Sequence, residues 1–341
     1  MYANDRDSAL FATHSQNCLW RVYSDGNIEK VSCFQDTPFG YRGHAYLGEN
    51  YPRISSDQHY VAAIRQDDLW IFEPDTKKIV RMTQVAKPYT NKYLSIEVNI
   101  VEWSWDSSKL LYSISSGDPG SGDDGFDRKE RPAKYGFYIY DVKHKSTIFT
   151  PYLKGGGLEA WLPDGDMLHV GTCKTVKGYE ECIMKSDLIE DKSIPFSIDR
   201  KMGQIDISRD GKWLVANTRV PREAFGKDPR GQIVKIDLNN YSIMPITAVG
   251  SWGEYQWPKF SPSGKHILYE WRAGVEKGFS VSHITVDGKK IYKAVQLSNC
   301  SWINDRTIVF TSSINATEYN KREIIIIDSV TGEIKGRHKI D

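Results

Sequence analysis

Short apolar stretches alternate with polar turns along almost the whole chain. In the clearest case, an Arg-Asp-Gly-Lys turn at 209–212 leads into the alternating pattern of Trp213, Val215 and Asn217, and a second apolar run follows at 232–238. Alternation with a period of two, rich in β-branched and aromatic residues and bounded by turn residues, is typical of half-buried strands. Such a unit cannot bury its apolar faces alone, so it predicts neighbours of the same kind.

The unit recurs at intervals that suit the blades of a propeller. A turn ahead of an apolar strand returns every 42 to 58 residues, at Asp57, Asp106, Asp164, Asp210, Ser263 and Asp305. A second apolar strand that runs into a turn occurs seven times, and the similarity of residues 4–13 to 304–311 supplies a seventh first turn. We predict an all-β fold with one domain over 1–341, a β-propeller of four-stranded antiparallel blades. Seven blades are favoured, and six are the alternative.

Two points stay open at this stage. No strand precedes the turn near residues 4–7, so the first blade is three-stranded, is completed by residues outside this chain, or is closed by a segment that the pattern does not reveal. A straight solenoid of the same units is the competing architecture. The longest interval between successive second strands contains the Gly- and Asp-rich segment 115–134, which we interpret as an insertion.

Composition narrows the classes of partner. The chain has 341 residues, with 45 basic and 44 acidic residues, so no overall positive charge attracts a nucleic acid. No apolar run approaches the roughly 18 residues of a membrane-spanning helix, which argues against membrane insertion. The first residues do not form a signal peptide, although a leader could have been removed before the numbering begins.

The five cysteines suggest two disulfides. Cys18 and Cys33 are equally distant from a turn at 25–26, and Cys173 and Cys182 are equally distant from a turn at 177–178, so each pair is predicted to face across a hairpin. Facing residues of an antiparallel ladder lie about 4.5–5.5 Å apart at Cα, which a disulfide tolerates. Cys300 is left over. Two disulfides would indicate a periplasmic or extracellular location, and free cysteines would indicate the cytoplasm.

The best copies of the unit, 260–269 and 205–214, resemble the repeat of the TolB-like propellers, a branch of the WD40-like repeat proteins. That repeat is an apolar strand, then Ser-Pro-Asp-Gly-Lys, then another apolar strand. The similarity covers the chain as a repeat pattern only, so it implies a fold and no particular function. Relatives that such a resemblance implies include periplasmic protein-binding subunits, propeller caps on serine peptidases, and sugar-acid lyases.

Long loops on one face of the propeller are the predicted binding surface. They carry aromatic residues with interspersed Arg and Glu, which suit a peptide segment or a sugar because rings stack and Arg pairs with carboxylates. The predicted ligand-binding residues are Tyr41, Arg42, His44, Tyr46, Tyr89, Tyr93, Arg219, Arg222, Arg230, Trp252, Glu254, Tyr255 and Arg272. The alternative is that these residues only pack the loops onto the rim.

The sequence gives only weak indications of a metal site or a catalytic site. Asp118, Asp123, Asp124 and Asp127 lie in a glycine-rich loop that could offer oxygen ligands to calcium, but they do not have EF-hand spacing, and a solvated loop is the simpler interpretation. The eight histidines show no metal-ligand spacing, and there is no Gly-x-Ser-x-Gly elbow or phosphate-binding glycine loop. We therefore predict no catalytic residues, no metal and no cofactor.

Tryptophan recurs ahead of the first turn of several blades, and this repetition predicts packing between blades. The residues are Trp103, Trp105, Trp161, Trp257 and Trp302. Together, these patterns favour a non-catalytic propeller that binds a protein or peptide on its loop-rich face. The alternative is a lyase-like enzyme or a sugar-binding propeller that acts on an acidic oligosaccharide.

Overall fold

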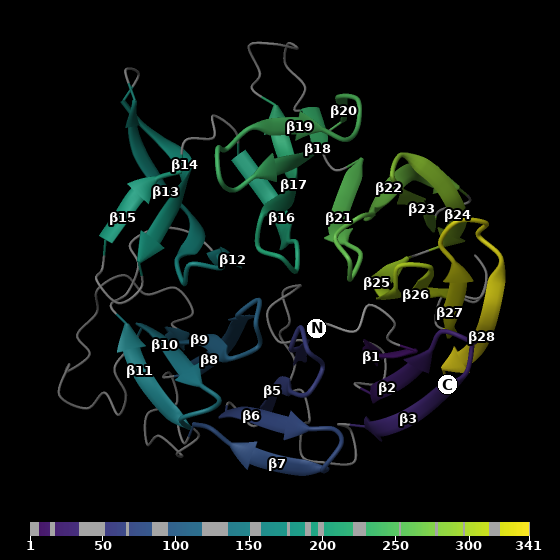
Figure 1. The fold of residues 1–341 in the computed structure, drawn as a ribbon, viewed down its shortest axis with the longest axis horizontal. Helices are drawn as coiled ribbons and strands as arrows, with labels where there is room; N and C mark the ends of the chain where they lie inside the picture. The colour runs from purple at the N-terminus through teal and green to yellow at the C-terminus, as the bar shows by residue number, and fades with distance from the viewer. Residues whose placement is uncertain are drawn as a thin grey trace.

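Seven antiparallel sheets are arranged as the blades of a β-propeller around a common axis (Figure 1). The computed structural model describes residues 7–13, 18–33, 52–65, 68–83, 95–117, 136–150, 158–175, 178–187, 192–196, 201–220, 230–251, 254–276, 279–295, 297–313 and 321–340, and these contain no helix. The all-β propeller predicted from the repeats is confirmed, and the number of blades is seven.

The strands of each blade run outward from the axis in chain order. Blade 1 holds β1 (Ser8–Thr13), β2 (Cys18–Tyr23) and β3 (Ile28–Cys33), and blade 2 holds β4 (Arg53–Ile54), β5 (Val61–Arg65), β6 (Asp68–Glu73) and β7 (Lys78–Arg81). Blade 3 holds β8 (Ser95–Trp103), β9 (Lys109–Gly117), β10 (Gly136–Asp141) and β11 (Ser146–Thr150). Blade 4 holds β12 (Leu158–Trp161), β13 (Met167–Thr175), β14 (Gly178–Asp187) and β15 (Lys192–Pro195).

The remaining blades follow the same plan. Blade 5 holds β16 (Lys201–Ile207), β17 (Trp213–Val220), β18 (Arg230–Asp237) and β19 (Ile243–Pro245), with the short β20 (Gly250–Ser251) added to β18; blade 6 holds β21 (Tyr255–Phe260), β22 (Ile267–Glu276), β23 (Phe279–Val286) and β24 (Lys289–Val295); blade 7 holds β25 (Ser298–Asn304), β26 (Thr307–Ser313), β27 (Arg322–Asp328) and β28 (Ile334–Ile340).

The core lies between neighbouring blades. One cluster joins blades 4 and 5 through Leu168, Leu214 and Val234, and another joins blades 6 and 7 through Ile284 and Phe310. The second and third strands are the most buried because blades cover both of their faces, and this gives them the continuous apolar runs seen in the sequence. The outermost strands, such as β15, are exposed.

The turn between the first and second strands is built by a serine and an aspartate two residues apart. In blade 5, the Ser208 hydroxyl donates to Asp210 Oδ1 at 2.6 Å and accepts the Trp213 N–H at 2.9 Å. Burial alone would raise the pKa of Asp210, but the hydrogen bonds from Ser208 and the Lys212 N–H outweigh it and lower the pKa. Ser55 with Asp57, and Ser104 with Asp106, make the same bond.

The residue after the aspartate, or after Ser263 in blade 6, has a left-handed backbone in five blades. It is glycine in three of them, at Gly165, Gly211 and Gly264, as the Asp-Gly and Ser-Gly turns predict. It is Gln58 in blade 2, with φ of 66°, and Ser107 in blade 3, with φ of 62°. Such a backbone costs a residue with a side chain about 1–3 kcal/mol, so these two side chains need a compensating role. Ser107 has one, because its hydroxyl accepts the Asp57 N–H at 2.9 Å.

A threonine after the fourth strand ties that strand to the third. Thr247 Oγ1 accepts the Ile233 N–H at 3.0 Å in blade 5, and Thr83 Oγ1 accepts the Leu69 N–H at 2.9 Å in blade 2. The Thr83 hydroxyl also donates to the buried Asp68 at 2.8 Å. The hydroxyl thus extends the ladder of hydrogen bonds by one position beyond the end of the strand.

Blades 1 and 7 close the ring by packing of side chains and backbone. Phe11 and Val22 of blade 1 share a buried cluster with Val309 and Ile326 of blade 7. At the rim, His338 Nε2 lies 2.8 Å from the Gly26 carbonyl oxygen. Within the described residues blade 1 has three strands, and these match the second, third and fourth strands of the other blades.

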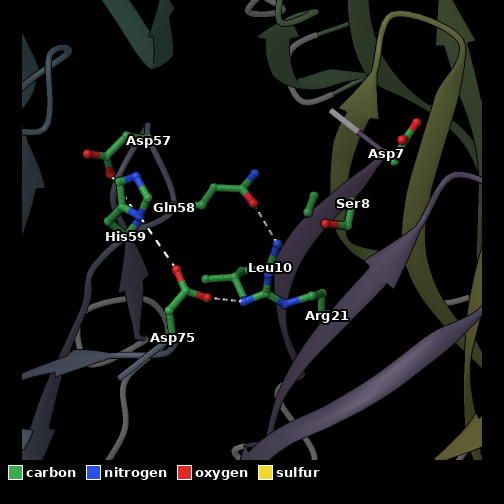
Figure 2. Close-up of a pocket in the computed structure, with 9 residues that line it drawn as sticks. Asp7, Ser8, Leu10, Arg21, Asp57, Gln58, His59 and Asp75 are labelled. Atoms are coloured by element: carbon green, nitrogen blue, oxygen red, sulfur yellow. Dashed lines mark hydrogen bonds and ion pairs between the residues drawn. The ribbon is translucent and has the colours of Figure 1, made fainter. Parts of the chain in front are cut away.

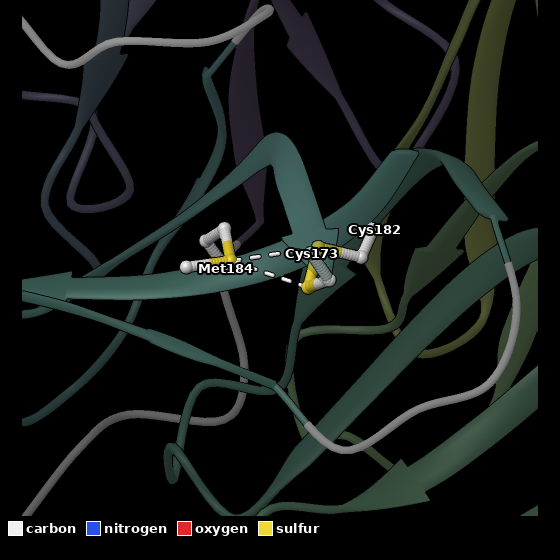
Figure 3. The surroundings of a disulfide bond; sticks show 3 residues. All are labelled: Cys173, Cys182 and Met184. Carbon is white, nitrogen blue, oxygen red and sulfur yellow. Dashed lines mark hydrogen bonds between the residues drawn. A yellow bond between two sulfur atoms is a disulfide. The ribbon is translucent and has the colours of Figure 1, made fainter. Parts of the chain in front are cut away.

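The disulfide Cys173–Cys182 is present at the end of the β13–β14 hairpin (Figure 3). Its register corrects the prediction: Cys173 faces Glu180, and Cys182 faces Gly171, so the two cysteines are diagonal neighbours and not direct partners. A shift of two residues keeps both side chains on one face of the sheet, and their Cα atoms are 5.8 Å apart. Met184 Sδ lies 3.6 Å from Cys173 Sγ and 3.5 Å from Cys182 Sγ.

The other predicted pair has the expected register. Cys18 faces Cys33 directly in the β2–β3 ladder, and Cys18 is disulfide-bonded. Cys300 is the free cysteine of the described residues, and burial raises the pKa of its thiol to about 12.

Candidate functional site

The innermost strands of five consecutive blades each carry a β-bulge. The register against the second strand shifts near Val101 in β8, Glu159 in β12, Gln204 in β16, Trp257 in β21 and Asn299 in β25. A bulge adds a residue to one strand and re-aims the side chains around it, and bulges are common beside functional sites. Register shifts also occur between outer strands of blades 1, 6 and 7, but at the innermost strands they recur in five consecutive blades.

Trp257 is the most unusual of these residues. Its φ is 54°, and 53% of its surface is exposed although it lies on an innermost strand. Its N–H donates to Gln204 Oε1 of the neighbouring blade at 2.7 Å, which holds the strained backbone in place. Because neighbouring blades cover the faces of the sheet, the exposed ring borders the axis of the ring of blades. A bulky residue held in this backbone conformation is a reason to suspect a functional site.

The role predicted for Trp257 as packing between blades is wrong. Trp103, Trp161 and Trp302 do pack between blades and are 3%, 4% and 6% exposed. Their indole N–H groups donate to backbone carbonyls, as in the 2.8 Å bond from Trp103 to Arg53. Trp257 lies three residues before Phe260, which occupies the repeat position that Trp103 fills in blade 3, and the Pro258 that follows it was the sequence signal for an irregular strand.

Three of the predicted binding residues lie together beside this bulge. Glu254 O accepts the Arg272 N–H at 2.7 Å, and Glu254 Oε1 accepts the indole N–H of Trp271 at 2.6 Å. The Tyr255 ring packs edge-on against Tyr269 with centroids 6.0 Å apart. Glu254 and Tyr255 at the start of β21 and Arg272 of β22 thus form one patch of blade 6.

Blade 5 supports this patch from the side. Asn217 is 4% exposed, and its Nδ2 donates to the Tyr255 carbonyl at 2.6 Å, which fixes the orientation of the amide. Asn217 Oδ1 has no hydrogen-bond partner among the described residues. Ahead of the patch, β20 pairs with β18, and a Cβ added at Gly250 would lie 2.5 Å from Glu254 Oε2. The loop can approach Glu254 this closely because position 250 has no side chain.

Arg272 is the exposed cation of the patch. Its side chain is 48% exposed, and Nε lies 3.4 Å from Oε1 of the buried Glu270. The Ser282 hydroxyl donates to the same oxygen at 2.5 Å. The pair fixes one edge of the guanidinium, and its other donors have no partner among the described residues.

One position of the innermost strand is charged in four blades, and in blades 3, 5 and 6 it follows the bulge. Each of these residues pairs with the same position of the second strand, and they are Arg53 in blade 2, Glu102 in blade 3, Asp206 in blade 5 and Lys259 in blade 6. Burial raises the pKa of Asp206 to about 6, even though its carboxylate accepts the Phe260 N–H at 2.7 Å and lies near Lys259. Lys259 Nζ donates to the Cys300 carbonyl at 2.9 Å.

The other predicted residues are placed as follows. Arg219 and Arg230 lie at the ends of β17 and β18 next to the patch, where only their backbones are described. Tyr41, Arg42, His44, Tyr46, Tyr89, Tyr93, Arg222, Trp252 and the four calcium candidates Asp118, Asp123, Asp124 and Asp127 lie outside the described residues.

Across the described ranges, no three His, Cys, Asp or Glu side chains gather as ligands for a metal ion. The same residues include no helix long and apolar enough to cross a bilayer.

Comparison with known proteins supports the fold. The β-propeller domain of the Trilobed protease from Pyrococcus furiosus is 16% identical, with a TM-score of 0.50 over 94% of this chain and 88% of that one. A putative TolB from Agrobacterium tumefaciens is 16% identical, with a TM-score of 0.46 over 79% of this chain and 85% of that one. An oligogalacturonate lyase in complex with manganese is 15% identical, with a TM-score of 0.42 over 74% and 70%.

No family model matches the chain, and no curated protein matches it. The propeller repeat predicted from the sequence is confirmed as a likeness of fold. At these identities the likeness identifies the architecture and leaves the function to the site itself.

Proposed function

We propose that the protein is a binding propeller that holds a segment of a protein or peptide partner where blades 5 and 6 meet near the axis. The binding surface consists of Glu254, Tyr255, Trp257 and Arg272. The observation that carries the proposal is the exposed Trp257 ring on a strained backbone, since a large aromatic side chain is a frequent anchor of a protein interface.

The chemistry of the patch suits a peptide. The Trp257 and Tyr255 rings offer flat apolar area with little loss of side-chain entropy, and the open donors of Arg272 suit a carboxylate of the partner. We further propose that the protein folds in an oxidising compartment, periplasmic or extracellular, because the Cys173–Cys182 disulfide would otherwise be kept reduced.

Capture of the partner from a lysate of the source organism tests the proposal. The double variant Trp257→Ala with Arg272→Ala should lose a partner that the wild type captures in stoichiometric amount. Ile194→Ala, which removes a 60% exposed side chain from the outer strand β15, is the matched control and should retain the partner. Equal capture by the double variant, or no stoichiometric partner for the wild type, would count against the proposal.

The acidic-oligosaccharide alternative is tested with the same variants. The protein is incubated with galacturonate oligosaccharides, and binding and cleavage are both followed. Saturable binding or cleavage that the double variant loses, without a protein partner, would replace the peptide proposal with the carbohydrate one.

A further inference from the structure

Trp257 differs from the other tryptophans of the innermost strands in what its indole N–H contacts. The indole groups of Trp103, Trp161 and Trp302 donate to the backbone carbonyls of Arg53, Gly165 and Lys259. The indole N–H of Trp257, in a residue that is 53% exposed, has no hydrogen-bond partner among the described residues. The ring of Trp257 and its donor are therefore both presented at the surface.

Two neighbouring side chains add further donors. Gln204 Oε1 accepts the Trp257 N–H at 2.7 Å, which fixes the orientation of the amide, and no described residue accepts a hydrogen bond from its Nε2 group. Arg272 contacts Glu270 through Nε, and its two Nη groups have no partner within the described ranges. Three side chains of this surface thus offer donors to a ligand.

The side-chain acceptors of the same surface are engaged or covered. Glu254 Oε1 accepts the indole N–H of Trp271 at 2.6 Å, and Glu254 Oε2 lies against Gly250. Asn217 Oδ1 is buried below the surface. The Tyr255 hydroxyl can donate or accept. Because a donor that is buried without a partner costs free energy, the surface suits a ligand that offers mainly carbonyl and carboxylate oxygens.

A proline-rich segment has this chemistry. Proline has no backbone N–H, and the polyproline II helix has no internal hydrogen bonds, so the segment presents carbonyl oxygens and few donors. Segments of this kind dock on surfaces lined by aromatic rings, and their preformed conformation reduces the entropy lost on binding. The rings of Trp257 and Tyr255 provide such a surface.

The spacing of the surface also fits this helix. Arg272 lies level with Glu254, because its N–H donates to the Glu254 carbonyl at 2.7 Å, and Trp257 follows three positions later in the chain. Three residues of a strand span about 10 Å. One turn of polyproline II helix, which is three residues, spans about 9 Å. A proline at Trp257 and an acidic residue three positions away can therefore reach Trp257 and Arg272 together.

We propose that the segment bound at this surface is proline-rich and carries an acidic residue. A proline ring packs on Trp257, the carbonyl oxygens of the segment accept the free N–H groups of Trp257 and Gln204, and an Asp or Glu three residues away pairs with Arg272. This inference rests on the proposed function, because it names the kind of peptide that the same surface binds.

Three labelled peptides test the proposal by fluorescence anisotropy. The first has eight prolines around a central aspartate, the second has lysine in place of the aspartate, and the third has alternating glycine and serine in place of the prolines. The first should bind at least 10-fold more tightly than either of the others. No saturable binding of the first up to millimolar concentration, or equal binding of the first and third, would overturn the proposal.

Variants locate the binding. Trp257→Ala should weaken binding of the first peptide at least 10-fold, and Trp257→Phe, which keeps a ring and removes the indole N–H, should have a smaller effect. Arg272→Ala should remove the preference for aspartate over lysine. Equal losses for Trp257→Ala and Trp257→Phe would overturn the role of the ring, and an unchanged preference in Arg272→Ala would overturn the role of the acidic residue.

Arg21 provides the matched control. It lines a cavity of about 180 Å³ between β1 and the turn of blade 2, where the Leu10 N–H donates to Gln58 Oε1 at 2.9 Å (Figure 2). Arg21 Nη2 lies 2.6 Å from Asp75 Oδ1, so a carboxylate of the protein already pairs with this guanidinium. Arg21→Ala should leave the binding of all three peptides unchanged, and weakening equal to that of Arg272→Ala would overturn the proposal.

The capture experiment separates this inference from the proposed function. A partner that the wild type captures and the double variant Trp257→Ala with Arg272→Ala loses, without saturable binding of the first peptide, would overturn this inference and leave the proposed function standing. Failure to capture a partner together with failure to bind the first peptide would overturn both.

Discussion

The backbone N–H of Trp257 donates to the side-chain oxygen of Gln204 at 2.7 Å, across the interface between blades 5 and 6. Both residues lie at bulges of innermost strands. The bond holds Trp257 in a left-handed conformation and leaves its ring exposed, so the fold maintains a strained aromatic residue where it contributes little to the core.

Replacing this tryptophan should not destabilise the protein. Trp257→Gly relieves a backbone strain of about 1 kcal/mol and removes a side chain that is half exposed, so the free energy of unfolding should stay equal or rise slightly. Trp103→Gly is the comparison. Trp103 is 3% exposed and stacks on Tyr60, so its loss should cost at least about 3–5 kcal/mol. Urea denaturation measures both, and a large loss for Trp257→Gly would assign this residue to the core.

The hydrogen bonds that the threonines after the fourth strands accept should contribute measurably to the free energy of unfolding. Thr247→Val keeps the shape of the side chain but leaves the Ile233 N–H without its acceptor, which should cost about 1–3 kcal/mol. Thr76→Val, at an exposed turn hydroxyl in blade 2, should cost well under 1 kcal/mol. Thermal unfolding of the two variants checks this, and equal costs would show that the Thr247 hydroxyl adds nothing to the ladder.

The stability of the protein should depend on pH through Asp206. Its pKa is about 6 in the folded protein and 3.8 as an ordinary carboxyl, so the folded state binds the proton more tightly. The stabilisation that protonated Asp206 provides is therefore complete below about pH 4, and it is lost as the pH rises to about 6. Asp206→Asn removes this dependence. Denaturation at pH 4, 5, 6 and 7 should show that the difference in the free energy of unfolding between the wild type and Asp206→Asn changes in this window. A constant difference would contradict the raised pKa of Asp206.

The Cys173–Cys182 bridge should stabilise the fold. A loop of this length gives about 2–3 kcal/mol by the chain-entropy model, so the double variant with both cysteines replaced by serine should unfold at lower denaturant concentration. Thiol counting under denaturing, non-reducing conditions should find one free cysteine, Cys300. Finding five free thiols would contradict both disulfides and the oxidising compartment.

The regular part of the fold could be predicted from the sequence. The turn aspartates and the apolar strands repeat, so their spacing predicted the blades, and the Cys18–Cys33 register followed from the position of its turn. The register at Cys173 was wrong by two residues because Thr175 pairs with Gly178, so the hairpin is centred one residue earlier than its Lys-Gly pair suggested.

The irregular part could not be predicted in the same way. The bulges of the innermost strands depend on contacts between blades, such as the bond from Trp257 to Gln204, and these residues are 53 positions apart. Repetition suggested that Trp257 was one more core tryptophan, and only the fold shows that it lies at a different repeat position. Gln58 is a similar case, since its side chain acts on a strand 48 residues away.

Photo-crosslinking from position 257 tests the central claim most directly. A photoreactive amino acid is introduced at position 257 or, as the control, at position 194 on the outer strand β15, and each protein is irradiated in the lysate that supplies the captured partner. The account predicts a crosslink to that partner from position 257 and none from position 194. A crosslink from position 194 alone would contradict the proposal that the partner binds where blades 5 and 6 meet.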